Sequence, residues 1–399
     1  MRTAIPSPLA ETAAGAIAES VLRACVHCGM CNAACPTYQL TGDELDGPRG
    51  RIYLMKQALE GEPTGPLTQL HLDRCLGCRA CETACPSGVE YHRLLDVGRS
   101  VGARPRGGRQ RLARWTIRRL ALSPRVLGLV FALGRAVRFA LPRRLRDAIP
   151  PRIATGPRPA RIHARRMLLL GGCVQSAAAG HFNAATARVF DRCGISLVES
   201  GGCCGAVSFH LDAGDEARTL ARRLIDAWTA QLAAGAEAIV VNASGCAAFI
   251  RDWPDLLAEE PAYAAKARAI VSALRDPVEV LSGLKINPAR RPADARIAVH
   301  DPCTLCNGPG LGGAPARLLR RLGYQPTPVA DAQCCGSAGA YALLQPRFAR
   351  RLRSRKLAAL TAGGAATIYT GNIGCWMHLS AASPIPVRHW IEAVDDLIG

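Results

Sequence analysis

The chain has 399 residues, of which 49% are hydrophobic and 20% are charged. These values are typical of a globular protein, and the length predicts two to four domains, which excludes a fibrous or wholly disordered chain. The formal net charge of +19 is local, because the segment from Arg104 to Arg166 holds 18 Arg and a single acidic residue, Asp147. That segment carries +17, and the remaining 336 residues carry +2.

The start of the chain does not have the pattern of a signal peptide, since Glu11 and Glu19 interrupt its apolar residues. The longest strongly apolar run, Val126 to Leu141, has 16 residues and includes Arg135 and Arg138, so it is too short to span a bilayer. We therefore expect a cytoplasmic protein, and a peripheral position on the inner face of the cytoplasmic membrane stays open. In that compartment the 18 Cys indicate metal ligation rather than disulfides.

The first part of the chain, residues 1–100, contains the pattern C-x2-C-x2-C-x3-C-P twice. This is the ferredoxin pattern, in which three close thiolates bind one [4Fe-4S] cluster and the fourth cysteine reaches the other cluster. It predicts a mainly helical, ferredoxin-like domain with two clusters. Structural zinc fits poorly, because a zinc site takes two C-x2-4-C pairs. The expected ligands are Cys25, Cys28, Cys31 and Cys85 for cluster 1, and Cys75, Cys78, Cys81 and Cys35 for cluster 2.

A helix is expected over residues 52–59, between the two cysteine patterns. Arg49 and Arg51 come directly before it. An arginine close to a reduced cluster would raise the potential of that cluster. The alternative is that both arginines only pair with nearby acidic residues.

The second part of the chain repeats itself at a spacing of about 130 residues. In each copy a single cysteine is followed by a Cys-Cys-Gly (CCG) motif and then by a further single cysteine. Constant spacing in a non-periodic chain indicates a duplicated domain, and we expect CCG domains at residues 166–285 and 295–399. The eight positions are Cys173, Cys203, Cys204 and Cys246, then Cys303, Cys334, Cys335 and Cys375.

Each copy is expected to be an α/β unit of strand, helix, strand, helix and strand, with its cysteines at strand ends, where open α/β sheets have their sites. The fold class is thus α+β and α/β, with a helical ferredoxin-like domain followed by two α/β CCG domains. Helices are expected after the CCG motifs, over residues 217–233 and 348–360. The strands expected before single cysteines are Met167 to Leu170, Ala238 to Val241, Arg296 to His300 and Ala366 to Thr370.

The eight repeated cysteines are possible additional metal ligands, because four thiolates in each copy would suit an iron-sulfur cluster or zinc. Two alternatives stay open: buried reduced thiols, and a redox disulfide between the vicinal cysteines. The glycine of each CCG motif is expected to let the backbone approach a metal or a flavin. Cys193 and Cys306 break the repeat and are expected to be structural, although Cys306 has ligand spacing from Cys303. The residues near these sites that are not predicted as ligands are His210, His300 and His378.

The double cysteine pattern followed by two CCG copies resembles the iron-sulfur subunits of glycolate oxidases over nearly the whole chain. It is also similar to the iron-sulfur subunits of anaerobic glycerol-3-phosphate dehydrogenase, lactate-utilisation complexes and heterodisulfide reductase. The strings that carry the resemblance to glycolate oxidase are GPRGRIYLMK from Gly47, HLDRCLGCRACETACPSGVEY from His71, NASGC from Asn242 and DPCTL from Asp301.

The resemblance implies an oxidoreductase subunit that passes electrons from FAD-containing partner subunits, which oxidise glycolate to glyoxylate, towards a quinone-type acceptor. The substrate site would lie on the partner chains, and no catalytic residue is predicted here. The sequence departs from heterodisulfide reductase, whose CCG module ends in C-x2-C, because Cys246 is followed by AAF and Cys375 by WMH. The alternatives are an iron-sulfur subunit of a lactate or glycerol-3-phosphate dehydrogenase, a heterodisulfide-reductase-like thiol-disulfide enzyme, and a scaffold with structural zinc.

The basic segment, residues 101–165, is expected to be a helical linker. Three interpretations stay open for it: an interfacial helix on anionic lipid, a solvated linker helix, and a docking face for the flavin subunits. Nucleic acid is not expected as a partner, because no binding motif is present. The apolar residues that recur at helical spacing are Ala113, Ile117, Leu120 and Ala121.

Overall fold

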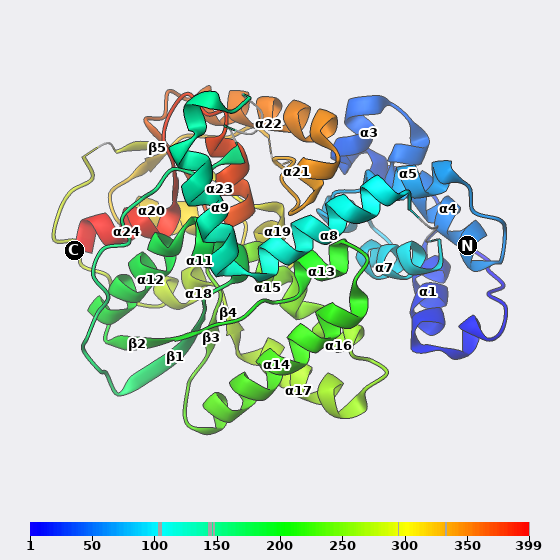
Figure 1. The fold of residues 1–399 in the computed structure, drawn as a ribbon, viewed down its shortest axis with the longest axis horizontal. Coiled ribbons are helices and arrows are strands. Elements are labelled where there is room, and N and C mark those ends of the chain that lie inside the picture. The colour runs from blue at the N-terminus through cyan, green and yellow to red at the C-terminus, as the bar shows by residue number, and fades with distance from the viewer. Residues whose placement is uncertain (103–105, 143–145, 147, 294, 332, 399) are drawn as a thin grey trace.

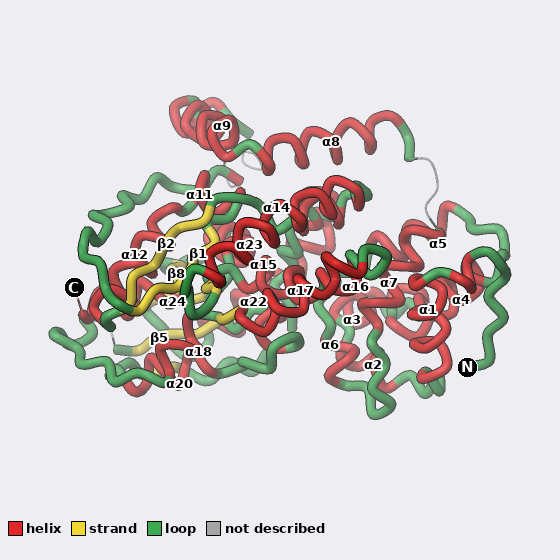
Figure 2. The backbone as a smooth tube through the Cα atoms, turned by 90° about the horizontal axis from the view of Figure 1, so that it is seen from below, coloured by secondary structure: helices red, strands yellow, loops and turns green. Residues whose placement is uncertain are grey.

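A computed structural model describes the whole chain except residues 103–105, 143–145, 147, 294, 332 and 399. A helical N-terminal part lies at one end of the molecule, and two α/β modules form the rest (Figure 1). The chain passes from one to the other through two long helices that lie along one side of the molecule (Figure 2). The expected fold class is confirmed.

The N-terminal part consists of short helices around two cysteine loops. Prolines begin three of these helices, at Pro36, Pro48 and Pro66, where the missing N–H costs no helical hydrogen bond. Leu22 and Met55 are fully buried in its core. The elements are η1 (Leu9–Glu11), α1 (Ala13–Ala24), α2 (Met30–Ala34), α3 (Pro36–Thr41), η2 (Glu44–Asp46), α4 (Pro48–Leu59), α5 (Pro66–Asp73), α6 (Ala80–Thr83) and α7 (Tyr91–Val101).

In the described part of the expected basic segment, the long helices are α8 (Gly108–Leu122) and α9 (Pro124–Ala136), followed by η3 (Arg138–Ala140). Helix α8 runs from the N-terminal part to the first module (Figure 1). Arg106, just before it, pairs with Asp73 at 2.6 Å and with Asp212 at 2.8 Å, so it joins the two parts. No helix among the described residues is long and apolar enough to cross a membrane.

The first module is a four-stranded parallel sheet in the order β2-β1-β3-β4, with helices on both faces. Leu168 of β1 is opposite Ile239 of β3 in the central pair of strands, and both residues are buried. The elements are β1 (Arg165–Leu170), α11 (Cys173–Ala178), α12 (Gly180–Arg192), β2 (Ile195–Ser200), α13 (Ala206–His210), α14 (Gly214–Ala233), β3 (Ile239–Val240), α15 (Ser244–Arg251), α16 (Trp253–Leu256), α17 (Pro261–Ala273), β4 (Leu274–Arg275) and α18 (Pro277–Ser282).

The second module repeats this topology, with the parallel strand order β6-β5-β7-β8. Each module has four strands where the sequence predicted three. The strands that the prediction missed are β4 and β8, which are only two and three residues long. The elements are β5 (Arg296–His300), α19 (Cys303–Cys306), α20 (Ala314–Arg321), β6 (Gln325–Pro326), α21 (Tyr341–Leu344), α22 (Pro346–Thr361), β7 (Thr367–Thr370), α23 (Ile373–Ser380), β8 (Val387–His389) and α24 (Trp390–Ile398).

The two modules share their hydrophobic core. Val189 and Phe190 of α12 lie in one buried cluster with Trp390 and Val394 of α24. Arg188 of the same helix forms an ion pair with Asp395 at 2.5 Å. Burial of these large side chains stabilises the paired modules as one unit.

Candidate metal centres

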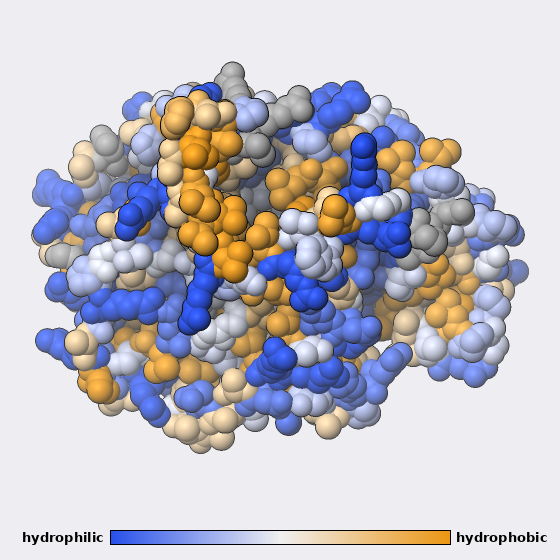
Figure 3. Space-filling model, viewed as in Figure 1, coloured by the Kyte–Doolittle hydropathy of each residue, from blue (hydrophilic) through white to orange (hydrophobic). Residues whose placement is uncertain are grey.

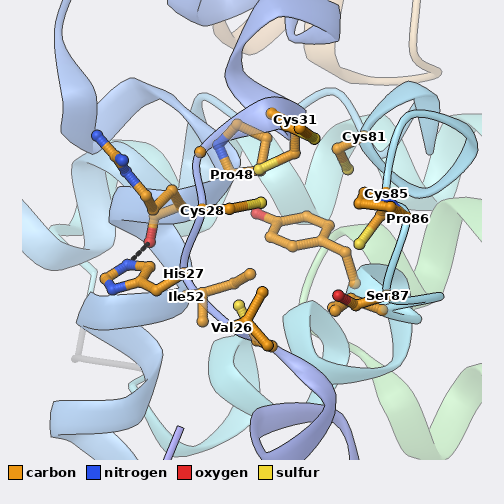
Figure 4. A pocket seen from close by; sticks show the side chains of 16 residues that line it. Val26, His27, Cys28, Cys31, Pro48, Ile52, Cys81, Cys85, Pro86 and Ser87 are labelled. Carbon is orange, nitrogen blue, oxygen red and sulfur yellow. Dashed lines mark hydrogen bonds between the residues drawn. The ribbon is translucent and has the colours of Figure 1, made fainter.

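Cysteines from both N-terminal patterns line a first cavity. Figure 4 shows the sulfur atoms of Cys28, Cys31, Cys81 and Cys85 directed into it. Cys25 lines it as well. The cavity therefore receives three cysteines from the first pattern and the last two cysteines of the second.

A second cavity is also lined by cysteines of both patterns. Its cysteines are Cys75, Cys78 and Cys81 from the second pattern and Cys35 from the first. Cys81 lines both cavities, so the two lie side by side. The structure thus brings together the sets of four cysteines that the sequence pairs.

The two cysteine loops have the same backbone conformation. Positive φ occurs on both sides of the second cysteine of each pattern, at His27 (60°) and Gly29 (85°) in the first loop and at Gly77 (61°) and Arg79 (58°) in the second. A non-glycine residue rarely adopts this region. These turns direct successive cysteines towards one point.

The chemistry of the two cavities suits iron-sulfur clusters. The side chains with metal affinity that gather in each are mainly thiols, which are soft ligands. Burial raises the pKa of the Cys31 thiol to about 11, and burial also raises the pKa of Cys78 and Cys81. A bound metal compensates this cost by stabilising the thiolate form.

Cys75 and Cys35 receive hydrogen bonds of the kind that tune such clusters. The backbone N–H of Gly77 donates to Cys75 Sγ at 3.5 Å, and Tyr91 Oη donates to the same sulfur at 3.7 Å. Arg51 Nη1 donates to Cys35 Sγ at 3.9 Å. Both sulfurs belong to cysteines that line the second cavity.

A buried charge network beside the second cavity escaped the sequence analysis. Asp46 is fully buried, and its carboxylate is hydrogen-bonded with His71 at 2.8 Å and Arg74 at 2.9 Å. Arg51 lies 3.6 Å from the same carboxylate. Arg49 instead pairs with Glu44 at 2.6 Å beside the first cavity. Each arginine therefore pairs with an acid, as one interpretation expected, and Arg51 also contacts a cysteine.

The four cysteines of the first module meet at the carboxyl ends of its strands. Cys203 Sγ lies 3.3 Å from Cys173 Sγ, and the Cys204 thiol is close enough to that of Cys246 to have its pKa raised by it. The hydrogen bond to Cys203 and burial raise the pKa of Cys173 well above its usual value. Cys246 also packs against the buried cluster of the second module, so it lies between the two sites.

The second module repeats this arrangement and adds a histidine. The sulfurs of Cys335 and Cys375 lie within 4.8 Å of each other, and Cys334 raises the pKa of the Cys303 thiol. A ring nitrogen of His300 lies within 4.8 Å of the sulfurs of Cys335 and Cys375. The sequence analysis did not predict His300 as a ligand, although its position at the end of β5, three residues before Cys303, was a usable signal.

The glycine of each CCG motif allows close packing of a helix. Gly205 and Gly336 have φ of +93° and +88°. A Cβ on Gly336 would lie 2.8 Å from Ala349 O of α22. The backbone N–H of each glycine donates to the sulfur of the first cysteine, at 3.5 Å for Cys203 and 3.4 Å for Cys334.

The remaining candidates lie apart from a complete thiol set. Cys193 is half-buried beside the shared core, as expected of a structural residue. Cys306 ends α19, and its sulfur lies beside the backbone of Gly312. The ring of His210 meets two phenylalanine rings edge-on, and His378 bonds with a backbone oxygen of α22 at 3.1 Å.

The second N-terminal cavity abuts the second module. Asn307 Nδ2 donates to Cys78 O at 2.7 Å, and the Cys303 charge contributes, after burial, to the raised pKa of Cys78. Tyr341 Oη donates to Arg74 O at 3.2 Å. The first cavity, the second cavity and the cysteine site of the second module therefore follow one another in space.

Comparisons with known proteins agree with this arrangement. Residues 21–89 match the family model of the 4Fe-4S dicluster domain, and residues 167–251 and 297–380 match that of the cysteine-rich domain. The chain is 46% identical to the glycolate oxidase iron-sulfur subunit of Escherichia coli (strain K12), over 100% of this chain and 99% of that protein.

More distant relatives share parts of the pattern. The probable glycolate oxidase iron-sulfur subunit of Bacillus subtilis (strain 168) is 30% identical, over 90% of this chain and 89% of that protein. A dihydromethanophenazine:CoB--CoM heterodisulfide reductase polypeptide of Methanosarcina barkeri is 25% identical, over 95% of this chain and 94% of that protein. Full-length similarity at 46% identity, together with the dicluster domain and two cysteine-rich domains, shows that the chain belongs to the family of glycolate oxidase iron-sulfur subunits and is an iron-sulfur subunit of an oxidoreductase.

Proposed function

We propose that this chain carries electrons out of a glycolate-oxidising complex through two [4Fe-4S] clusters in its N-terminal part. The observation that supports this most is the pair of adjacent cavities, each lined by cysteines from both patterns. Each cluster, when bound, takes up and releases one electron. The proposed ligands are Cys25, Cys28, Cys31 and Cys85 for the first cluster, and Cys75, Cys78, Cys81 and Cys35 for the second.

The residues around the clusters would exclude water and bias their charge. Tyr91 and Ile52 are buried at the walls of the first cavity. Arg51 is 1% exposed and places a positive charge beside Cys35. Low solvent exposure and a nearby cation both influence the reduction potential of a cluster.

The eight module cysteines are proposed as ligands of two further soft-metal sites, occupied by iron-sulfur clusters or zinc. Support comes from the paired sulfurs at the strand ends and from the contact of Cys78 with the second module. A thiol-disulfide enzyme is less compatible with these sites. The hydrogen bond to Cys334 and burial raise the pKa of Cys303 well above its usual value, which makes it a poor nucleophile at neutral pH.

The partners proposed are FAD-containing subunits, which oxidise glycolate to glyoxylate, and a quinone-type acceptor. The similarity to the Escherichia coli protein supports the substrate. The G-x-G-x-x-G string from Gly308 to Gly313 does not follow a strand directly, since α19 lies between it and β5. It therefore lacks the context of a dinucleotide site, and flavin chemistry is assigned to the partners. The proposed localisation is the cytoplasm, at the inner face of the membrane, where a quinone is available.

The test is to measure which substrate donates electrons to the purified complex. With its flavin subunits the complex should reduce a soluble quinone analogue when glycolate is supplied, and lactate and glycerol 3-phosphate should not replace glycolate. A complex that oxidises lactate or glycerol 3-phosphate but not glycolate contradicts the proposed substrate.

A further inference from the structure

Helix α9 is apolar on two sides, and only one of them is covered. Leu127 and Phe131 are buried against the body of the molecule, where α9 packs on α11. The opposite side carries Leu129 and Leu133, which are 60% and 58% exposed. A soluble helix normally turns such residues towards a core. The exposed side therefore has the composition of a contact surface.

The exposed side forms a continuous row, which we name the α9 face. Val126, Leu129, Val130 and Leu133 follow the i, i+3, i+4, i+7 spacing of one helical face. Val137 and Phe139, which is 87% exposed, continue the row just beyond the end of α9. Figure 3 shows hydrophobic side chains gathered over α9 on the side of the molecule where α8 and α9 lie. An exposed apolar patch of this kind marks an interaction site. The α9 face consists of Val126, Leu129, Val130, Leu133, Val137 and Phe139.

The charges that the sequence places around the α9 face are positive. The sequence contains no Asp or Glu from residue 97 to residue 146. Arg125 and Arg138 are exposed at the two ends of the face. Other arginines of the segment are neutralised on its inner side, where Arg114 pairs with Asp212 at 3.1 Å and Arg118 with Glu216 at 3.0 Å.

We propose that the α9 face docks on an anionic lipid surface, with its apolar side chains among the acyl chains and Arg125 and Arg138 at the headgroups. An apolar helix face bordered by arginines and free of carboxylates matches a negatively charged bilayer in both hydrophobicity and charge. Trp115 of α8 is 50% exposed, and tryptophan is enriched at membrane interfaces. The proposal rests on the proposed function for its purpose, since it would bring the chain to a membrane quinone.

The experiment is sedimentation of the full-length, cluster-loaded chain with vesicles. One set contains phosphatidylethanolamine with about a quarter phosphatidylglycerol, and the other contains phosphatidylcholine only. We expect binding to the anionic vesicles, weakened by salt. The double variant Leu129→Glu/Leu133→Glu should bind at least about tenfold more weakly, because it places two charges in the apolar layer.

The matched control is Leu67→Glu/Leu343→Glu, which changes leucines that are 67% and 60% exposed elsewhere on the surface and should leave binding unchanged. A second variant, Arg125→Gln/Arg138→Gln, removes charge without altering the apolar face and should bind about tenfold more weakly. Equal binding of the Leu129→Glu/Leu133→Glu and control variants overturns the proposal, and so does absence of binding by the unaltered chain.

Failure of the lipid proposal can be distinguished from failure of the proposed function, because vesicle binding needs neither glycolate nor the flavin subunits. If the Leu129→Glu/Leu133→Glu variant instead loses its flavin subunits in a pull-down while the unaltered chain ignores vesicles, the face docks protein and the lipid proposal is wrong.

Discussion

Arg51 Nη1 lies 3.9 Å from Cys35 Sγ, and both residues are buried. Among the described residues that line the first cavity there is no comparable buried cation, since Arg49 is 37% exposed and paired with Glu44. The two cavities therefore differ in electrostatics although their cysteine patterns are the same. The cavity with the buried cation is also the one that abuts the second module.

This asymmetry predicts that Arg51→Met lowers the reduction potential of the second cluster. A unit charge about 6 Å away is worth roughly 3 kcal/mol at an effective dielectric constant near 20, which corresponds to a shift on the order of 0.1 V. A redox titration followed by EPR measures it. The control variant, Arg49→Met, should leave the potential of the second cluster in place, and an unshifted second cluster in Arg51→Met would show that the arginine only neutralises Asp46.

The crossed ligand sets predict how iron is lost when cysteines are replaced in pairs. Cys28 and Cys85 come from different patterns but line the same cavity. Cys28→Ala/Cys85→Ala should thus remove one cluster, about four Fe per chain, whereas Cys28→Ala/Cys78→Ala should remove both, about eight. Iron analysis of the purified variants decides this. Loss of about eight Fe from the first variant would mean that each pattern holds its own cluster.

The contact of the CCG glycine with the following helix predicts a large loss of stability in Gly336→Ala. The substitution adds a Cβ 2.8 Å from Ala349 O at a φ of +88°. Left-handed strain and overpacking together should lower the free energy of unfolding by about 3 kcal/mol. Gly339→Ala is the control, because φ is +60° there but a Cβ meets nothing within 4 Å, so only about 1 kcal/mol is expected. Similar losses in denaturant titrations of the two variants would contradict this account.

Buried histidine predicts a loss of stability in mild acid. His389 is fully buried, accepts a hydrogen bond from the Ile391 N–H at 3.1 Å and bonds with Asn242 O at 2.9 Å. Burial lowers its pKa from 6.5 to about 4. As the pH falls, this histidine is protonated in the unfolded chain before it is protonated in the folded one. Its contribution to the free energy of unfolding is therefore fully present above about pH 6.5 and is lost as the pH falls towards 4.

The measurement is the unfolding transition at several pH values between 7 and 5. His389→Gln should show a shallower decline than the unaltered chain, because one fewer proton is taken up on unfolding. Parallel declines in the two proteins would assign the acid sensitivity to other groups.

Much of this architecture could be predicted from the sequence because it depends on residue spacings and on an internal repeat. The cysteine spacings predicted that cysteines of both patterns gather at each cavity, although Cys81 lines both, and the 130-residue repeat predicted two modules of the same topology. Strands β4 and β8 were missed because Leu274–Arg275 and Val387–His389 are too short to show an alternating pattern.

The charge network at Asp46 could not be predicted, because its partners are distant in sequence. His71 and Arg74 are 25 and 28 residues away, and only the packing of α4 and α5 against η2 brings them to one carboxylate. The same holds for His300, which approaches Cys375 only because β5 and β7 are neighbours in the sheet. These contacts depend on tertiary structure, and only for His300 does the sequence offer a signal, its position three residues before Cys303.

The most direct test of the central claim is the iron, sulfide and zinc content of the anaerobically purified chain, with EPR of the reduced protein. The account predicts at least about eight Fe and eight sulfide per chain and magnetically interacting S = 1/2 signals from two adjacent clusters. Zinc in place of iron, with no EPR signal on reduction, would contradict the electron-transfer role.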